Sequence, residues 1–297
     1  MECNYLLFYD CIISISNLSD NRFVLHLSLS SKNNRNAIFY ISHGKITIDV
    51  NLIRYFPNLK ILITNDHLQS DDIKHLKSLN TLILSTNNSI DNLSYTTDIH
   101  RLNLDYNEKI IHISYLTRLT FLNLFNHAPV NNLDSLIYLK ELYFGWDSYV
   151  TNISKLTLLT TLSLYNNQLI DNLRTLTNLL ELYMGNNCLV TNLNYLISLT
   201  KLKLLSNTTV SDIRNLLNLR ILSLGHNENI IEINILTNLY KLKLDNGINI
   251  SDVSNLIGLT KLCMGNNNLI YRIDTLTNLK HFESNNNTKI LSIVCRK

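Results

Sequence analysis

Leucine recurs at a fixed interval of 20 residues through most of the chain, and this interval defines a repeat. In residues 159–167, for example, leucine fills the first, fourth and sixth positions as Leu159, Leu162 and Leu164. Such alternation of apolar and polar residues is typical of a β-strand with one buried face. We therefore predict one short strand per repeat, all of them parallel. The first position is filled by Leu59, Leu79, Ile99, Leu119, Leu139, Leu159, Leu179, Leu199, Leu219, Leu239, Leu259 and Leu279.

The second half of each repeat has a different apolar spacing. Ile170, Leu173 and Leu176 lie three residues apart, and the same spacing recurs in most other repeats. A spacing of three favours a 3₁₀-like or extended turn, which places such residues on one side. Too little chain remains for a full α-helix. Each repeat is therefore predicted to form one coil of a solenoid, with its leucines pointing into a common interior.

Asparagine at the ninth position is predicted to be structural. A buried amide at this position can bond backbone groups of its own coil and of the adjacent coil, forming a ladder. Losing one amide would leave buried backbone groups unpaired, at a cost of roughly 1–3 kcal/mol each. The chain departs from this pattern at His67, His127, Asp147 and Gly247, and we expect the ladder to break at Gly247. The asparagines are Asn87, Asn107, Asn167, Asn187, Asn207, Asn227, Asn267 and Asn287.

The motif L-x-x-L-x-L-x-x-N resembles that of the leucine-rich-repeat family. The resemblance covers residues 59–297, as about twelve repeats with the last one truncated, and the short repeat is similar to that of internalins and phosphatase-regulating repeat proteins. It implies an arc-shaped solenoid with a concave parallel β-sheet and a 3₁₀-like or extended convex side. It also implies that a partner binds on the concave sheet.

The two ends of the chain are less regular. Residues 1–58 are expected to form a β-rich N-terminal cap and a divergent first repeat, with strand-like alternation in residues 5–16, 23–30 and 37–48. At the other end Phe282, Ile290 and Ile293 fit the coil pattern, but no dedicated cap follows. We expect the last coil to fray or to pair with another molecule, which would allow self-association.

A longer period of 40 residues lies over the first one. Glycine closes the strand segment in alternate repeats, at Gly145, Gly185, Gly225 and Gly265. Duplication of a two-coil unit explains this pattern, so some outward residues are inherited and were not individually selected for contact.

The strand register also predicts which side chains point outward from the sheet: those at the third, fifth, seventh and eighth positions. Aromatic residues fill these positions in the middle repeats, flanked by Glu141 and Glu181, and lysines fill them in later repeats. Ser163 is an outward residue that we expect to be exposed. The candidate partner-binding residues are Tyr106, Phe121, Phe125, Tyr143, Trp146, Tyr165, Tyr183, Lys201, Lys203, Lys241, Lys243 and Lys261.

Trp146, the only tryptophan of the chain, would supply the centre of this candidate site together with its aromatic neighbours. Tryptophan and tyrosine contribute much of the binding energy at protein–protein contacts. The lysines would attract an acidic segment of the partner. The alternative explanation is that aromatic residues suit strands and simply pack on one another along the sheet.

Charge and hydropathy exclude several classes of partner. The chain mixes 26 basic with 23 acidic side chains for a net charge of +3, which is too even for a nucleic-acid-binding face. No run approaches 18 apolar residues, so we expect no membrane span. The N-terminus has no basic segment typical of a signal peptide.

Cysteine usage favours a reducing compartment. The five cysteines are scattered without a C-x-x-C pair, so we predict neither a disulfide framework nor a zinc site. The chain contains glycosylation sequons such as those that begin at Asn87 and Asn207, but both of these asparagines are predicted ladder residues, where a glycan would not fit. We expect a cytoplasmic protein.

Catalysis is not expected. The nine histidines lie apart from one another, and the chain has no metalloprotease motif, nucleophile elbow or glycine-rich phosphate loop. We predict a non-catalytic protein-interaction module that needs neither cofactor nor metal. A regulatory or targeting subunit of a phosphatase or ubiquitin ligase is the alternative that the resemblance suggests, and a surface adhesin is less favoured.

Overall fold

The computed structural model describes residues 5–8, 11–17, 23–29, 59–63, 68–85, 87–126, 129–145, 149–165, 167–186, 188–245, 248–265, 270 and 273–284, with the first three segments described as backbone only. The chain divides into two compact units, Met1–Leu139 and Lys140–Lys297. Each unit contains parallel strands of the repeat.

The first unit begins with a three-stranded antiparallel sheet of β1 (Tyr5–Phe8), β2 (Cys11–Asn17) and β3 (Phe23–Leu29). Tyr5 pairs with Ser14 and Cys11 with Leu29. The prediction of one strand over residues 5–16 was therefore wrong: the alternation continues, but these residues contribute two strands, β1 and β2, which pair antiparallel. The strand expected over residues 37–48 and the cap role of residues 1–58 lie outside the described residues.

The parallel strands of the first unit follow the predicted register. Leu62 pairs with Leu82, and Leu82 pairs with Leu102, each 20 residues further along the chain. The first of these coils has a single helical turn where the others have turns, and the Asp72 carboxylate caps it by accepting a 2.8 Å bond from the Gln69 amide. The elements are β4 (Ile61–Ile63), α2 (Ser70–Ile73), β5 (Thr81–Ile83), β6 (Arg101–Asn103) and β7 (Phe121–Leu124).

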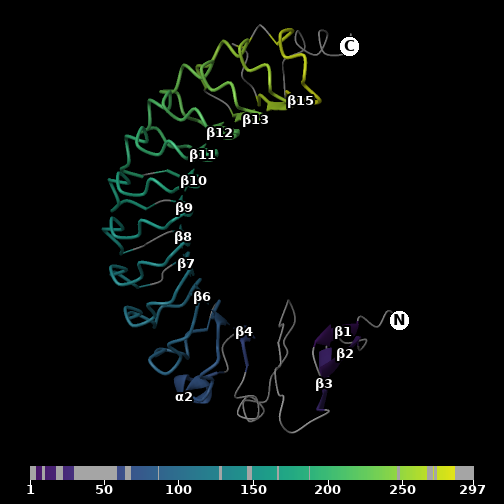
Figure 1. Cartoon of the computed structure of the whole chain (residues 1–297), viewed down its shortest axis with the longest axis vertical. Helices are drawn as coiled ribbons and strands as arrows, with labels where there is room; N and C mark the ends of the chain where they lie inside the picture. The colour runs from purple at the N-terminus through teal and green to yellow at the C-terminus, as the bar shows by residue number, and fades with distance from the viewer. Residues whose placement is uncertain are drawn as a thin grey trace. The chain divides into compact units, whose positions relative to one another are not determined.

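The second unit consists of parallel strands in the same register, so the prediction of one parallel strand per repeat is confirmed. Leu162 pairs with Leu182, and Leu202 pairs with Leu222. Within this unit the strands lie along the inner, concave side of its curve (Figure 1). The elements are β8 (Glu141–Phe144), β9 (Thr161–Leu164), β10 (Glu181–Met184), β11 (Lys201–Leu205), β12 (Ile221–Gly225), β13 (Lys241–Leu244), β14 (Lys261–Cys263) and β15 (His281–Glu283).

The interior of the coils is apolar, as the repeat predicts. Leu159, Leu162 and Leu164 have no exposed surface. On the turn side, the Leu156 amide donates to the Ile153 carbonyl at 3.0 Å, and the Leu159 amide donates to the Leu156 carbonyl at 3.1 Å. These bonds span three residues, so the 3₁₀-like character predicted from the apolar spacing is confirmed as a series of short turns.

The asparagine ladder at the ninth position is also confirmed. The amide nitrogen of Asn227 donates to the Asn207 carbonyl at 2.5 Å and to the Val210 carbonyl at 3.0 Å, while its oxygen accepts two backbone bonds at 3.0 Å. Asn167 accepts two backbone bonds in the same way, but its amide nitrogen has no partner among the described residues. The four departures at His67, His127, Asp147 and Gly247 lie outside the described residues.

A second ladder runs along the outside of the coils and was not predicted. Asparagine at the last position of the repeat donates to the backbone of the preceding coil, as Asn218 does to the Ile197 carbonyl and Asn238 to the Leu217 carbonyl, both at 2.9 Å. Threonine at the second position does the same, as when the Thr160 hydroxyl donates to the Lys140 carbonyl at 3.1 Å. These bonds connect neighbouring coils where little apolar surface is buried.

Candidate partner-binding surface

We name the outward side of the second unit's strands the open face. Its residues come from the third and fifth positions of the repeat. Along the third position, from β8 to β15, these are Glu141, Thr161, Glu181, Lys201, Ile221, Lys241, Lys261 and His281. Along the fifth position they are Tyr143, Ser163, Tyr183, Lys203, Ser223, Lys243, Cys263 and Glu283. The open face therefore changes from acidic and aromatic to basic along the strands.

Glu181, Tyr183 and Lys201 form a connected cluster at this change of character. The Tyr183 hydroxyl donates to the Glu181 carboxylate at 2.6 Å, and the Lys201 ammonium donates to the same oxygen at 2.9 Å. The Lys201 nitrogen also lies 5.0 Å from the centre of the Tyr183 ring, and the Lys203 nitrogen lies 5.3 Å from it. Cation–π attraction acts at these distances. The Tyr183 ring is therefore held in place by contacts with three neighbours.

The pKa values of the cluster reflect this coupling. Burial tends to raise the pKa of Glu181, but hydrogen bonds from Tyr183 and Lys201 outweigh it and leave the pKa below its usual value. The pKa of Lys201 is raised, chiefly by its interaction with Tyr183 and also by Glu181. The pKa of Tyr183 is raised by burial and by its bond to Glu181. At neutral pH the cluster thus holds a carboxylate, a neutral phenol and an ammonium.

Two strands away, Tyr143 repeats part of this arrangement. Its hydroxyl donates to the Glu141 carboxylate at 3.3 Å. Burial and the nearby Glu141 charge raise the pKa of Tyr143 to about 12. Between the two tyrosines lies Ser163, which is only 8% exposed. The expectation that Ser163 is exposed was therefore wrong: it does point outward, but two larger side chains flank it.

The lysines that follow are gathered on the open face, as predicted. Lys203 lies on β11, Lys241 and Lys243 on β13, and Lys261 on β14. Burial lowers the pKa of Lys203, and repulsion from Lys201, Lys241 and Lys243 lowers it further. Lys243 pairs with Asp245 at 3.2 Å. Positive charge is concentrated here.

Glycine alternates with larger residues at the seventh position of the repeat. Gly145, Gly185 and Gly225 are buried, whereas the intervening Tyr165 and Leu205 are partly exposed. A Cβ placed on Gly225 would lie 3.4 Å from the Leu205 Cα and from the Asp245 carboxylate, so the neighbouring coils already approach this backbone closely. At Gly225 a Cβ would therefore reach ordinary van der Waals contact with both neighbouring coils, and a longer side chain there would meet them.

Three further predicted aromatics lie in the first unit. The Phe121 ring stacks against the Arg101 guanidinium at 4.0 Å, and Phe125 donates its amide to the Asn123 side chain at 3.0 Å. Tyr106 is 48% exposed and has φ = 58°, a left-handed conformation that is unusual for tyrosine. Trp146, the predicted centre of the site, lies outside the described residues.

The known proteins that resemble this chain do so in structure. No protein-family model and no curated protein matches the sequence. An internalin from Listeria monocytogenes matches with 24% identity and a TM-score of 0.61, over 80% of this chain and 76% of that chain. The functional domain of InlJ from Listeria monocytogenes matches with 21% identity and a TM-score of 0.53, over 78% of this chain and 64% of that chain.

A chain of the Drosophila Toll–Spätzle complex matches with 15% identity and a TM-score of 0.54, over 95% of this chain and 47% of that chain. This chain therefore spans less than two thirds of the InlJ domain and of the chain from the Toll–Spätzle complex. The parallel coils, their leucine interior and these matches agree on one architecture. The fold is a leucine-rich-repeat solenoid.

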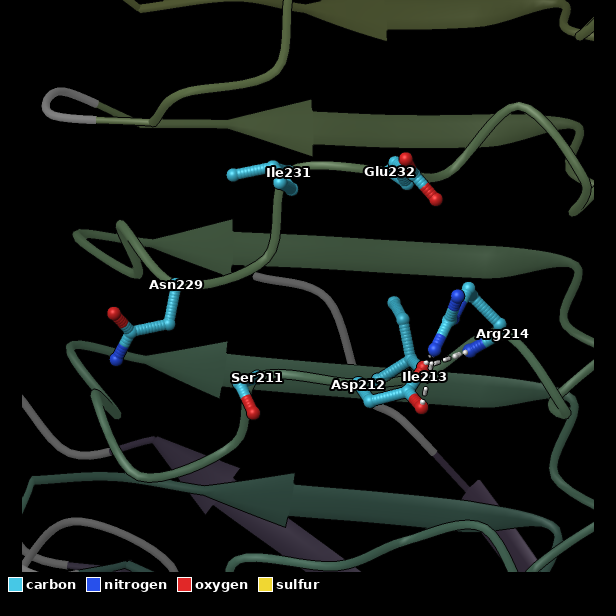
Figure 2. A pocket seen from close by; sticks show the side chains of 7 residues that line it. All are labelled: Ser211, Asp212, Ile213, Arg214, Asn229, Ile231 and Glu232. Carbon is cyan, nitrogen blue, oxygen red and sulfur yellow. Dashed lines mark hydrogen bonds and ion pairs between the residues drawn. The ribbon is translucent and has the colours of Figure 1, made fainter.

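The turn side of the solenoid has a shallow pocket of about 240 Å³ between neighbouring coils (Figure 2). The Arg214 guanidinium binds both oxygens of Asp212, at 3.0 and 3.2 Å, and Ile231 and Glu232 line the pocket from the next coil. Arg214 lowers the pKa of Asp212 to about 2. This pair is open to solvent, where ion pairs contribute little stability.

Sequence reasoning missed a set of exposed apolar residues on this turn side. Ile197 and Leu217, on adjacent coils, are 58% and 48% exposed, and Ile257 is 59% exposed. All three occupy the nineteenth position of the repeat, so their recurrence could have been found from the period. These residues form a second exposed apolar set, which lies outside the open face.

Among the described residues, no group of three or more His, Cys, Asp or Glu side chains could hold a metal ion. No helix in these segments is long and apolar enough to cross a membrane.

Proposed function

We propose that this leucine-rich-repeat solenoid is a non-catalytic module that binds a protein partner on its open face. The observation that carries the proposal is the Glu181–Tyr183–Lys201 cluster, in which an aromatic ring is fixed by neighbours on a rigid sheet. A preorganised aromatic side chain loses little conformational entropy on binding. Aromatic residues beside complementary charges are typical of the energetic centre of protein interfaces.

The comparisons support a protein partner at this coarser level. One similar structure is a chain of a complex between two proteins, Toll and Spätzle. Internalins supply the other likeness, which concerns the fold alone at the identities observed. Which face the partner of this chain uses is part of the proposal.

We also propose a reducing, intracellular compartment. Cys188 and Cys263 form no disulfide with each other. Two of the sequon asparagines, Asn87 and Asn207, are buried, with their side chains bonded in the ladder, so a glycan on either would disrupt the stack. Thiol labelling of the protein in intact cells and after lysis would test this proposal. Cysteines already oxidised in the cell would contradict it.

The partner-binding proposal can be tested with the intact chain as bait. A pull-down followed by mass spectrometry identifies candidate partners, which are then titrated against Trp146→Ala and Tyr183→Ala. Truncating an aromatic hot spot typically costs 2 kcal/mol or more, so we expect each variant to bind at least roughly thirtyfold more weakly.

Arg174→Ala is the control, because Arg174 lies on the turn side with its guanidinium 5.1 Å from the Tyr195 ring centre. This variant should bind the partner normally. If the control loses affinity while the two aromatic variants retain it, the partner uses the turn side and the proposal fails.

A further inference from the structure

Strand β12 is the only strand from β10 to β14 without a charged residue at the third or fifth position. Its outward residues are Ile221, Ser223 and Gly225. Ser223 is 6% exposed and Gly225 is buried, so these two residues project little from the sheet. The strip also carries no charged side chain of its own. It lies between two lysine-bearing strands, because β12 pairs with β11 on one side and with β13 on the other.

The lysines on both sides of the strip face each other across it. Lys203 on β11 and Lys243 on β13 are both in register with Ser223, and Lys201 and Lys241 are both in register with Ile221. The repulsion that Lys203 receives from Lys201, Lys241 and Lys243 indicates that these ammonium groups act on the same region. An anion placed over β12 would relieve this repulsion.

The four lysines are not equally available. Lys201 is held by Glu181 on β10, away from the strip, and Lys243 is paired with Asp245. Lys203 and Lys241 make no ion pair within the described part of the chain. These two lie diagonally across the strip, one on each side, and leave positive charge uncompensated on both of its edges.

The width of the strip favours one shape of ligand. Strands two apart in a sheet are separated by about 9.6 Å, twice the strand spacing of about 4.8 Å. An α-helix with its side chains is about 10–12 Å wide, whereas a single extended chain is narrower. In an extended chain, alternate side chains point to one side at intervals of about 6.6 Å, which matches the interval from Lys241 to Lys243 along β13.

We propose that the strip over β12 receives an extended segment of the partner protein whose acidic residues occupy alternate positions. The segment lies along the strand direction, with its carboxylates between Lys203 on one side and Lys241 and Lys243 on the other. This inference rests on the proposed function, and it specifies the chemistry of the partner at that site.

The surroundings favour carboxylates of a protein over a nucleic acid. Glu181, Asp245 and Glu283 lie on or beside the same face and interrupt its positive charge, so a segment whose acidic residues are spaced apart fits this face better than a continuous phosphate backbone does. The third and fifth positions from β8 to β15 carry no arginine, the residue best suited to phosphate. The tyrosines beside the lysines offer apolar contact to the ends of a peptide.

The test uses the full chain and a labelled synthetic peptide in which glutamate alternates with threonine. Fluorescence anisotropy at low ionic strength measures binding, because exposed charges are screened by salt. The double variant Lys203→Gln, Lys241→Gln removes the two lysines that make no ion pair among the described residues, and it is expected to weaken peptide binding by roughly tenfold or more. The control double variant Lys140→Gln, Lys280→Gln removes the same charge at exposed residues outside the strip and should bind within about twofold of the parent chain.

Three outcomes would overturn the inference. The parent chain could fail to bind the alternating peptide at low salt, both double variants could lose binding equally, or a peptide with the same glutamates in one contiguous block could bind as well. Binding of a single-stranded oligonucleotide in place of the peptide would instead assign the strip to nucleic acid.

The natural partner separates this inference from the proposed function. If Tyr183→Ala abolishes partner binding while the Lys203, Lys241 double variant retains it, the open face is the binding site but the acidic assignment is wrong. If neither change has an effect, both proposals fail.

Discussion

At the scale of single residues, asparagine has three distinct structural tasks in this solenoid. At the ninth position it bonds buried backbone, as Asn227 does, and at the last position it bonds the preceding coil from outside, as Asn218 does. At the fourteenth position it accepts a local backbone bond that shapes a turn, as Asn172 does from the Arg174 amide at 2.8 Å. Asparagine can do this because its side chain is both donor and acceptor.

The ninth-position ladder gives a prediction that compares two buried asparagines. Asn227→Ala removes bonds made by both ends of the amide, whereas Asn167→Ala removes only accepted bonds, since the Asn167 nitrogen has no partner among the described residues. Each broken buried bond costs roughly 1–3 kcal/mol. We expect Asn227→Ala to lower the free energy of unfolding by more than Asn167→Ala does, by at least about 1 kcal/mol. Equal losses of unfolding free energy in denaturant titrations would contradict this prediction, because they would show that the unpaired nitrogen of Asn167 makes no difference to stability.

Adjacent residues of β9 provide a second comparison. Leu162 has no exposed surface, and Leu162→Ala should lower the free energy of unfolding by about 2–5 kcal/mol through lost apolar contact and the cavity left behind. Ser163→Ala removes a small outward group and should cost less than about 1 kcal/mol. Chemical denaturation of the two variants measures both values. Similar losses would mean that the inward and outward assignments of this strand are wrong.

At the scale of strands, the leucine spacing predicted the register because a shift of one residue would place every leucine in solvent. The contacts among Glu181, Tyr183 and Lys201 could not be predicted in the same way. They depend on which of several neighbours a long side chain reaches, and the spacing does not specify that choice. The burial of Ser163 was missed for a related reason, since it depends on the size of residues 20 positions away on either side.

The pairing of Tyr143 with Glu141 predicts a dependence on alkaline pH. The pKa of Tyr143 in the folded chain, about 12, lies above the ordinary value of 10.0, so folding favours the neutral phenol. Its contribution to stability is therefore present below pH 10 and is lost as the pH rises through about 12. In an ultraviolet titration of phenolate, Tyr143→Phe should remove one late-ionising group, and Glu141→Gln should make that group ionise earlier. A titration curve whose late portion is identical in Tyr143→Phe and the parent chain would contradict this assignment.

At the scale of the whole molecule, each coil is bonded mainly to its immediate neighbours, through strands, asparagines and threonines. Solenoids of this kind derive their stability from each repeat and from the contacts between adjacent repeats. Damage from a substitution should therefore remain partly local to its unit. The open face is ordered in the same way, strand by strand. Its tyrosines lie on β8 and β10, and its lysines lie on the later strands from β11 onward.

The alternation of glycine with larger residues at the seventh position of the second unit predicts that this unit accepts a pair of extra coils better than a single one. Inserting a second copy of residues 179–218 after residue 218 would keep Gly185 and Leu205 in alternation with Gly225. A second copy of residues 199–218 alone would put two leucines side by side where a glycine now gives way to its neighbour. We expect the longer insertion to unfold cooperatively with a steeper denaturant dependence, because it exposes more surface on unfolding, and the shorter one to be destabilised.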